Sequence, residues 1–282
     1  MEIRNLKHTE FDTLFRGFER AFSDYEIHFE KEEVRSMLKR RGYDPLLSFA
    51  AFDGGEIVAF TLTGTGMHAG VSTAYDTGTG TAAECRGQGL AGEIFTYAIP
   101  FLKEAGIRQY LLEVLQGNQK AIAVYRRMNF EVTREFDCYR QAIDHIRYAN
   151  DADTACVIKS VNIDLICQAQ AFCDFSPSWQ NSIDSIRRGL SDLTCLGAFI
   201  DGKMAGYCVF DANTGDLSQI AVHDGCRRRG IASRLLHEAI SRMNTDVVKI
   251  LNIASDDTTL PAFLKSRGIG LASRQYEMIL PL

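Results

Sequence analysis

Two stretches decide the fold of this 282-residue chain: Arg86-Gly87-Gln88-Gly89-Leu90-Ala91-Gly92 and Arg227-Arg228-Arg229-Gly230-Ile231-Ala232-Ser233. Each one separates a run with the composition of a strand from a run whose apolar residues recur at helical spacing. Glycine at the start of a helix leaves the backbone N–H groups of the first turn uncovered, where the positive end of the helix dipole favours an anion. The sequence therefore predicts two phosphate-binding turns.

The residues around the first turn predict strands on both sides of it and helices between the later strands. The stretch 73–83 is extended but rich in threonine and glycine, which suggests that a ligand backbone approaches it closely. Pro100 lies inside the helical pattern that begins at Leu90 and could kink its last turn. We expect strands at 1–6, 48–52, 57–62, 73–83 and 110–114, helices at 9–22, 31–41, 90–105 and 118–125, and a final hairpin from 130.

The second half of the chain repeats this pattern after a polar, acidic stretch at 141–153, which we interpret as a linker. Ala198-Phe199 before Asp201-Gly202 corresponds to Ala51-Phe52 before Gly54-Gly55, and the two turns follow at a nearly constant offset. We therefore predict two copies of one α/β domain with a mixed sheet, at 1–142 and 152–282. The second copy should have strands at 157–159, 217–223 and 247–253, helices at 164–172, 178–190, 230–243 and 259–265, and hairpins at 195–210 and before 282.

The composition argues against several classes of protein. A net charge of -5 argues against nucleic acid as the partner, because phosphate backbones are usually met by a strongly basic face. The eight cysteines form no CxxC pair and have no partnering histidine cluster, so neither a zinc site nor a disulfide framework is indicated. The sequence shows no signal peptide and no apolar run long enough to cross a membrane, so we expect a cytoplasmic protein.

The order of the elements, together with Arg-x-x-Gly-x-Ala after a strand, resembles the GNAT superfamily of acetyl-CoA-dependent N-acyltransferases. The family's pyrophosphate loop has this form, and the motif occurs twice here in the same context, so the resemblance covers nearly the whole chain as two tandem domains. Other phosphate-binding motifs fit badly. Gly-x-x-x-x-Gly-Lys-Ser/Thr is absent from both turns, and a Gly-x-Gly-x-x-Gly dinucleotide turn would follow the first strand rather than the fourth.

The resemblance implies direct transfer of an acetyl group from acetyl-CoA, as co-substrate, to an amine, without a metal. Tyr125 corresponds to the tyrosine that protonates the sulfur of coenzyme A, while Asn118 either binds the pantetheine arm or only caps a helix. The general base is left open among Glu84, Asp76 and His68. The residues implied in binding the donor are Thr81, Ala82, Ala83, Arg86, Gly87, Gln88, Gly89, Leu90, Ala91, Gly92 and Asn118 in the first copy, and Val222, Arg227, Arg229, Gly230, Ile231 and Ala232 in the second.

The second copy departs from the family at the position of the acid. Phe263 or Leu264 corresponds to Tyr125, depending on a one-residue ambiguity in the alignment, and neither side chain can donate a proton. Asp256 or Asp257 corresponds to Asn118, and a carboxylate offers no amide donors. We therefore predict that the first domain performs the chemistry, while the second binds coenzyme weakly, shapes the acceptor site or serves as scaffold.

The function predicted on this basis is N-acetylation of a small-molecule or peptide amine by a monomer or homodimer, without a nucleic-acid or membrane partner. The alternative is a non-catalytic acetyl-CoA-binding sensor or interaction protein. A degraded second site and an unusual Thr/Gly-rich strand favour that alternative, whereas the paired loops and Tyr125 favour the enzyme.

Overall fold

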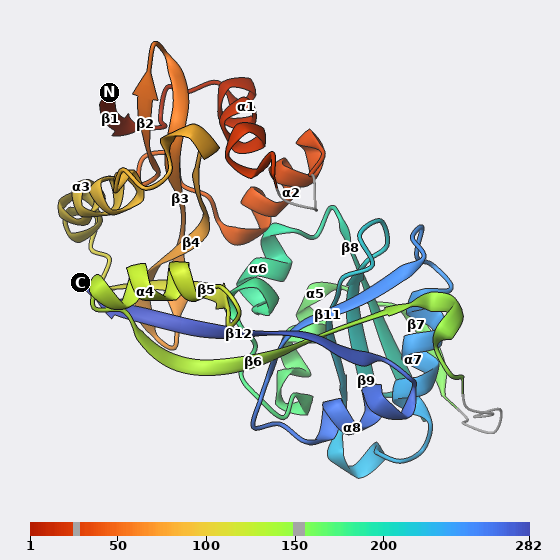
Figure 1. Cartoon of the computed structure of the whole chain (residues 1–282). Helices are drawn as coiled ribbons and strands as arrows, with labels where there is room; N and C mark the ends of the chain where they lie inside the picture. Colours follow the sequence, from red (N-terminus) through yellow and green to blue (C-terminus); the bar gives the residue numbers. More distant parts are fainter. Residues whose placement is uncertain (25–28, 149–155) are drawn as a thin grey trace. The chain divides into compact units, whose positions relative to one another are not determined.

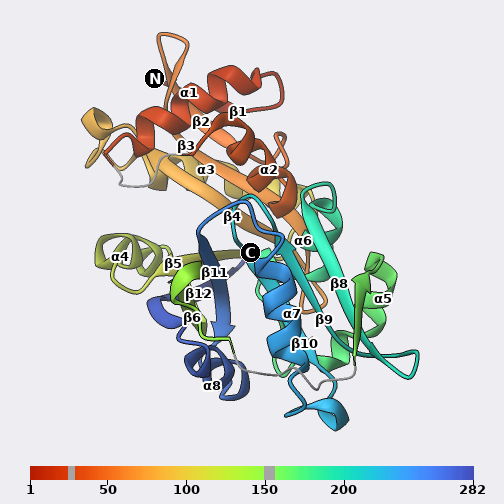
Figure 2. The same cartoon turned by 90° about the vertical axis from the view of Figure 1, so that its right-hand side faces the viewer.

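The computed structural model of the chain describes residues 1–24, 29–148 and 156–282 (Figures 1 and 2). The chain divides into two compact units, which we call the first unit (Met1–Thr133 with Glu277–Leu282) and the second unit (Arg134–Tyr276). The boundary at 152 and the end of the expected linker at 141–153 lie outside the described residues. Each unit is described by itself below.

The first unit is built on a mixed sheet, as its sequence predicts. Its strands are β1 (Glu2–Asn5), β2 (Phe49–Asp53), β3 (Glu56–His68), β4 (Val71–Thr81) and β5 (Gln109–Leu115), followed in the sheet by the end of β12 (Gly270–Pro281). The pairs from β1 to β4 are antiparallel, whereas β4 and β5 are parallel. A parallel pair inside an antiparallel sheet is a place where two neighbouring strands end at the same edge.

Helices cover both faces of this sheet (Figure 1). On one face, Phe18 of α1 (Phe11–Phe22) stacks on Phe60 of β3, and α2 (Lys31–Arg41) contributes to the same apolar core. On the other face, Phe95 of α3 (Leu90–Glu104) packs edge-on against Tyr110 of β5, and Phe130, which follows α4 (Gln119–Arg127), joins them. Pro100 lies inside α3 without ending it.

The second unit repeats this plan. Strands β7 (Val157–Ser160), β8 (Leu193–Ile200), β9 (Lys203–Asp211) and β10 (Leu217–Val222) form a sheet in the order β10-β9-β8-β7, and β11 (Val247–Ala254) pairs with β6 (Glu131–Ala142). Helices α7 (Ile231–Ile240) and α8 (Thr259–Ser266) pack on one face, where Figure 2 shows α7 against the strands. The short helices α5 (Ile163–Gln168) and α6 (Ile183–Arg188) cover the other face.

Two sequence expectations about the elements are wrong. Each copy ends in one long strand, β6 or β12, rather than in a hairpin. The interiors of both strands lack glycine and proline, so nothing turns the backbone. The helix expected at 178–190 is also interrupted, because the Ser182 side chain caps α6 by accepting a hydrogen bond from the Ser185 N–H group.

Glycine in β4 has a reason within the protein itself. A Cβ atom at Gly80 would lie 2.7 Å from the Phe60 ring and 2.9 Å from the Cβ of Ala21, so helix α1 and β3 leave no room for a side chain. At Gly78 the nearest atom would be a ring carbon of Phe18 at 4.0 Å. Close packing of α1 therefore accounts for Gly80 without the ligand that the sequence suggested.

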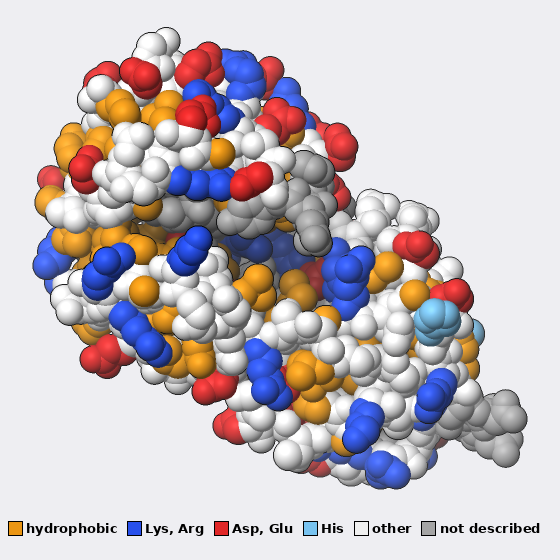
Figure 3. Space-filling model, in the orientation of Figure 1, with side chains coloured by type: hydrophobic (Ala, Val, Ile, Leu, Met, Phe, Trp, Pro, Cys, Tyr) orange, Lys and Arg blue, Asp and Glu red, His pale blue; other side chains and the backbone are white. Residues whose placement is uncertain are grey.

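Three further observations concern surface charge, membrane-spanning helices and metal-binding side chains. On the face drawn in Figure 3, basic side chains are interspersed with acidic and uncharged ones. Within the described parts of the chain, no helix is both long enough and apolar enough to cross a membrane. The same residues contain no group of three or more His, Cys, Asp or Glu side chains that could hold a metal ion.

Candidate active site

The two glycine-containing turns have the same backbone geometry. In the first, Gly87 and Gly89 have φ of +80° and +83°, the left-handed region that favours glycine. Gly89 is the N-cap residue of α3 and accepts a hydrogen bond from the Glu93 N–H group (3.1 Å). In the second, Gly230 (φ +76°) caps α7 and accepts from the Arg234 N–H group (3.0 Å). Each turn thus directs the first-turn N–H groups of a helix toward one point.

The first-turn amides are the groups that the sequence predicts to bind an anion. Neither Gly89 nor Gly230 offers a side-chain cap, and the helix ladder begins only at Glu93 and at Arg234. The N–H groups of residues 90–92 and 231–233 are therefore placed to bind an anion at the positive end of the helix. A pyrophosphate group fits this arrangement, because backbone donors need no particular side chain at these positions.

The arginine that opens each turn clamps it to the rest of its unit. Arg86 donates to the Thr81 and Ala21 carbonyls (3.1 and 2.9 Å) and forms an ion pair with Asp24, whose shortest N–O distance is 2.5 Å. Arg227 donates to the Val222 and Phe172 carbonyls (3.2 and 3.5 Å) and to Asp174 (2.9 Å). Both guanidinium groups therefore hold the turn in shape, a role that their place in the motif did not reveal.

Strands β4 and β5 part just before the first turn. They pair only from Thr73 to Tyr75 on β4, opposite residues 109–111. The pairing of β4 with β3 shifts register beyond Asp76, so that Thr77 is an extra residue, as in a β-bulge. Arg41 donates to the Thr77 carbonyl (2.8 Å), and the Thr77 hydroxyl donates to the Leu62 carbonyl (2.9 Å). The bulge turns β4 away from its neighbour and is held in place from both sides.

The donors offered by the far end of β4 follow from strand alternation. The Ala82 N–H group donates to the Val58 carbonyl (2.9 Å), so this amide belongs to the ladder with β3. Backbone groups alternate along a strand, and the N–H groups of Thr79 and Thr81 therefore point to the opposite edge, on the side of β5. Because β5 has parted from β4 there, these amides can pair with an extended ligand.

Asp76 occupies the last position before the bulge. Its Oδ1 atom accepts from the Gly78 N–H group and its Oδ2 atom accepts from the Thr79 hydroxyl, both at 2.9 Å. Burial raises the pKa of Asp76 to about 6, against the effect of these donors, of Arg41 and of a hydrogen bond from Tyr125. A carboxylate with this pKa is charged at neutral pH yet can accept a proton.

Tyr125 and Asn118 come from α4. The Tyr125 ring packs edge-on against Phe130, with centroids 5.6 Å apart, and its hydroxyl lies close enough to Asp76 to lower the pKa of that carboxyl. Asn118 is the N-cap of α4, since its Oδ1 atom accepts from the Ala121 N–H group (3.2 Å). The capping role of Asn118 is thus present in the structure, and the fold brings Tyr125 of α4 near Asp76 of β4.

The other two candidate bases lie elsewhere. Glu84 is exposed in the turn Ala83–Cys85, where it forms a close ion pair with Arg20. A backbone hydrogen bond within Glu84 itself and the Arg20 guanidinium lower its pKa. His68 ends β3, with its Nε2 atom 3.7 Å from the Glu277 carboxylate. The Tyr125 hydroxyl, in contrast, lies near Asp76 and lowers the pKa of its carboxyl.

A further carboxylate near β4 had no role in the sequence interpretation. Glu113 lies on β5, two positions beyond the last residue that pairs with β4, and its Oε2 atom accepts from the Tyr75 hydroxyl (3.1 Å). Burial, followed by the Glu113 charge, raises the pKa of Tyr75. An acidic residue within the apolar run Tyr110–Val114 was the available signal for this position.

The second unit shows which residues correspond to Asp76 and Tyr125. Its strand β10 has an equivalent bulge at Ser218, so Leu217 takes the position of Asp76. The Phe130 N–H group donates to the Tyr125 carbonyl, and likewise Ile269 donates to Leu264, both at 3.0 Å. This pattern at the helix end assigns Leu264, rather than Phe263, to the position of Tyr125. Asp257 caps α8 as Asn118 caps α4, because its carboxylate accepts from the Leu260 N–H group.

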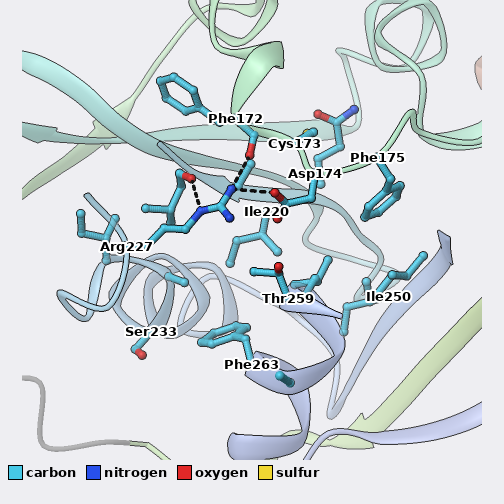
Figure 4. Close-up of a pocket in the computed structure, with 18 of the residues that line it drawn as sticks. Phe172, Cys173, Asp174, Phe175, Ile220, Arg227, Ser233, Ile250, Thr259 and Phe263 are labelled. Atoms are coloured by element: carbon cyan, nitrogen blue, oxygen red, sulfur yellow. Dashed lines mark hydrogen bonds and ion pairs between the residues drawn. The ribbon is translucent and has the colours of Figure 1, made fainter. Parts of the chain in front are cut away.

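A cavity of about 530 Å³ lies in the second unit between the turn, β10 and β11 (Figure 4). The two strands meet only at the Asp216–Lys249 bridge and separate beyond it. Phe172, Phe175, Ile220, Ile250 and Phe263 give the cavity apolar walls, while Figure 4 shows the Arg227 guanidinium held at its edge by Asp174 and two carbonyls. Val222, Gly230, Ile231 and Ala232, which the sequence implied in donor binding, line it as well.

Comparisons with known proteins agree with these features. The model of the Acetyltransferase (GNAT) family matches residues 11–130 and 165–269 of this chain. N-alpha-acetyltransferase MAK3 of Arabidopsis thaliana is 31% identical over 104 residues, which are 36% of this chain and 55% of that protein. The match thus spans little more than half of that relative.

Solved structures resemble the chain over its whole length. A tandem GNAT protein from the clavulanic acid biosynthesis pathway superposes with a TM-score of 0.71 at 14% identity, over 99% of this chain and 98% of that one. A GCN5-related N-acetyltransferase from Sphaerobacter thermophilus has the same TM-score and identity, over 99% and 95% of the two chains. At this level of identity the similarity demonstrates a shared tandem fold.

Proposed function

This chain belongs to the GNAT acetyltransferase family, and we propose that it is an N-acetyltransferase that moves the acetyl group of acetyl-CoA to an amine in its first unit. The observation that carries the proposal is the position of the Asp76 carboxylate, which lies at the bulge where β4 parts from β5 and near enough to Tyr125 for that hydroxyl to lower its pKa. The second unit has leucine at both equivalent positions. At these positions, only the first unit therefore combines the glycine-containing turn with side chains that can exchange protons.

The first unit would hold the donor mainly through its backbone. The N–H groups of Leu90, Ala91 and Gly92 would bind the pyrophosphate, with Arg86 keeping the turn in shape through Asp24. The N–H groups of Thr79 and Thr81 would pair with the pantetheine arm along the open edge of β4, much as an added strand pairs with a sheet. The thioester supplies the activated acetyl group, so the protein need not form a covalent intermediate.

Two side chains would serve the transfer itself. The Tyr125 hydroxyl is the acid for the departing sulfur, and the Asp76 carboxylate is the base for the amine. Glu84 is the rival base, but its ion pair with Arg20 and its exposure leave it without a contact to Tyr125. We take Asp76 as the base for this reason.

The second unit is proposed to bind coenzyme A or a related ligand without turning it over. Its turn, its first-turn amides and the cavity of about 530 Å³ provide an anion site that continues into an apolar pocket. Leu217 and Leu264 are fully buried and cannot exchange a proton. This combination favours binding over catalysis in that unit.

The test is acetyl transfer by the purified full chain. Thiol release from acetyl-CoA is followed with a panel of small-molecule amines and of peptides with free N-termini, and mass spectrometry identifies the acetylated product. The peptides are included because the matched relative is an N-alpha-acetyltransferase. Acetyl-CoA binding in calorimetry without transfer to any member of the panel would instead favour the non-catalytic binding protein.

A further inference from the structure

We infer that Gln219 closes the coenzyme site of the second unit to an acceptor, whereas Gly78 leaves the equivalent passage of the first unit open, an inference that rests on the proposed function. The two residues are equivalent, because each is the first residue after the bulge of its strand. Gln219 pairs with Val209 of β9 as Gly78 pairs with Leu62 of β3. This position decides whether an acceptor can reach the donor.

Two cavities of the second unit meet at Gln219. The cavity of about 530 Å³ between the turn, β10 and β11 has a neighbour of about 410 Å³, which extends to Gln170, Ser182 and Ile183 next to α5 and α6. Gln219 lines both cavities, together with Cys173, Asp174, Phe175 and Pro177, of which Figure 4 labels the first three. These shared residues form the wall between the side of the sheet that carries the turn and the side that α5 and α6 cover.

Hydrogen bonds at both ends of its amide hold the Gln219 side chain in this wall. Its Oε1 atom accepts from the Tyr207 hydroxyl (2.9 Å), and its Nε2 atom donates to the Asn181 carbonyl (2.6 Å). Gln219 is 7% exposed, and a buried amide that loses its partners is costly. The side chain therefore stays in place rather than swinging aside to let a second ligand pass.

Asn181 extends the wall across the gap between the parted strands. Its Nδ2 atom donates to the Leu251 carbonyl of β11 (2.8 Å), whereas its own carbonyl accepts from Gln219 of β10. Ser178 adds a second link to β11, because its hydroxyl accepts from the Asn252 side chain (3.2 Å). This short segment thus ties β10 to β11 at the inner end of the larger cavity.

Neither packing nor backbone geometry requires glycine at position 78 of the first unit. A Cβ atom at Gly78 would lie 4.0 Å from the ring of Phe18 in α1, and apart from its chain neighbours no other described atom would lie within 4 Å. Its φ is outside the left-handed region, so the backbone does not favour glycine either. Gly80, in contrast, has no room for a side chain. An open passage is a reason for glycine that the local structure does not supply.

A passage at this position is what acetyl transfer needs. The donor would fill the gap between the strands from the side that carries the turn, so the amine must reach the thioester from the opposite side of the sheet. Gln219 and Asn181 occupy that route in the second unit, whereas Gly78 leaves it free in the first. The second unit is therefore closed to an acceptor, independently of the leucines at positions 217 and 264.

The first test places the second unit's side chain in the first unit, as Gly78→Gln in the full chain. A displacement of the amine by about 1 Å costs up to about 10²-fold, so kcat/KM for the amine should fall at least about tenfold, with the KM for acetyl-CoA within about threefold of the wild type. Gly78→Ala, whose Cβ the structure accommodates, should stay within about threefold of the wild type in both. Gly270→Gln is the matched control, because Gly270 is exposed and has space around it. Urea unfolding checks that each variant is folded.

The second test needs no turnover and opens the wall of the second unit, as Gln219→Ala. The acyl chain of octanoyl-CoA could then pass from the larger cavity into the smaller one. Calorimetry should show at least about tenfold tighter binding of octanoyl-CoA than in the wild type, the gain expected from burying about two more methylene groups, with little change for acetyl-CoA. Adding Gly230→Ala strains the turn of the second unit and should weaken this binding about tenfold, which assigns the gain to that unit.

The outcomes separate this inference from the proposed function. A folded Gly78→Gln variant that transfers acetyl groups at the wild-type rate, or equal affinities of the wild type and Gln219→Ala for octanoyl-CoA, would overturn the inference while acetyl transfer by the wild type stands. A wild type that binds acetyl-CoA but acetylates no amine would remove the proposed function, and the octanoyl-CoA titrations would then decide whether Gln219 closes the second unit.

Discussion

The two units build one scaffold around different side chains. Both have the same turn, a clamping arginine and a bulge in the strand before it, at Thr77 and at Ser218. They differ in the side chains around the bulge, where Asp76 and Tyr125 of the first unit correspond to Leu217 and Leu264 in the second. The comparison teaches that the fold builds the same turn in both units, whereas the two side chains to which we assign the chemistry are present in the first unit alone.

The largest effect is expected from removing the proposed base of the first unit, Asp76. Asp76→Asn should lower kcat by about 10²–10⁴-fold, because the amide cannot accept the amine's proton. Asn retains an oxygen that can accept from the Gly78 N–H group, so the bulge should persist. Steady-state rates at saturating acetyl-CoA measure this loss. An Asn variant as active as the wild type would move the base to another residue.

The buried Asp76 carboxylate should lower the free energy of unfolding at pH values above the pKa of an unfolded aspartate. The pKa of Asp76 is about 6 in the folded chain and about 3.8 otherwise, so between these values only the folded state holds the proton. Raising the pH through this window removes stability, by up to about 3 kcal/mol for a shift of about 2 units. Urea unfolding at pH 4 and pH 7 should show this loss in the wild type and not in Asp76→Asn.

The exposed Asp53→Asn variant serves as the control and should follow the wild-type curve. Parallel curves for the wild type and Asp76→Asn would mean that the carboxylate is as well solvated in the folded chain as in the unfolded one. That result would contradict the statement that burial raises the pKa of Asp76.

A smaller effect concerns the turns. Gly89 and Gly230 have positive φ, and a Cβ atom at Gly89 would meet nothing within 4 Å, so an alanine there strains the backbone without a clash. Left-handed geometry costs about 1–2 kcal/mol for a residue with a Cβ. Gly89→Ala should therefore raise the KM for acetyl-CoA about tenfold. Gly230→Ala should leave this KM unchanged, and the reverse pattern would assign the reacting donor to the second unit.

The smallest effect is expected at Glu84. Its carboxylate is exposed and paired with Arg20, so Glu84→Gln should change kcat by no more than about threefold. The rate is compared with that of Asp76→Asn in the same assay. A loss for Glu84→Gln as large as that of the Asp76 variant would show that the exposed carboxylate takes part in the transfer.

Local patterns predicted much of the fold. The turns, the repeat, the mixed sheet and helices such as Lys31–Arg41 follow from glycine positions and apolar spacing, which act over a few residues. The final hairpins were wrong because strand-like composition does not say whether a strand bends back or continues. Its continuation depends on pairing partners that lie far away in the sequence.

The site was predicted less completely. Tyr125 and Asp76 were each identified as candidates, but the choice of Asp76 over Glu84 required burial and a partner, which are properties of the folded chain. The partners of the clamping arginines, Asp24 and Asp174, are 62 and 53 residues away from Arg86 and Arg227 and carry no local signal. Contacts of this range are decided by the fold.

The most direct test of the central claim makes the first unit like the second. The variant Asp76→Leu/Tyr125→Leu places in the first unit the two residues that the second unit already accommodates in its core. We predict that acetyl transfer falls at least 10²-fold, while calorimetry still detects acetyl-CoA binding and urea unfolding shows a folded chain. Transfer at the wild-type rate by this variant would contradict the claim that Asp76 and Tyr125 of the first unit perform the chemistry.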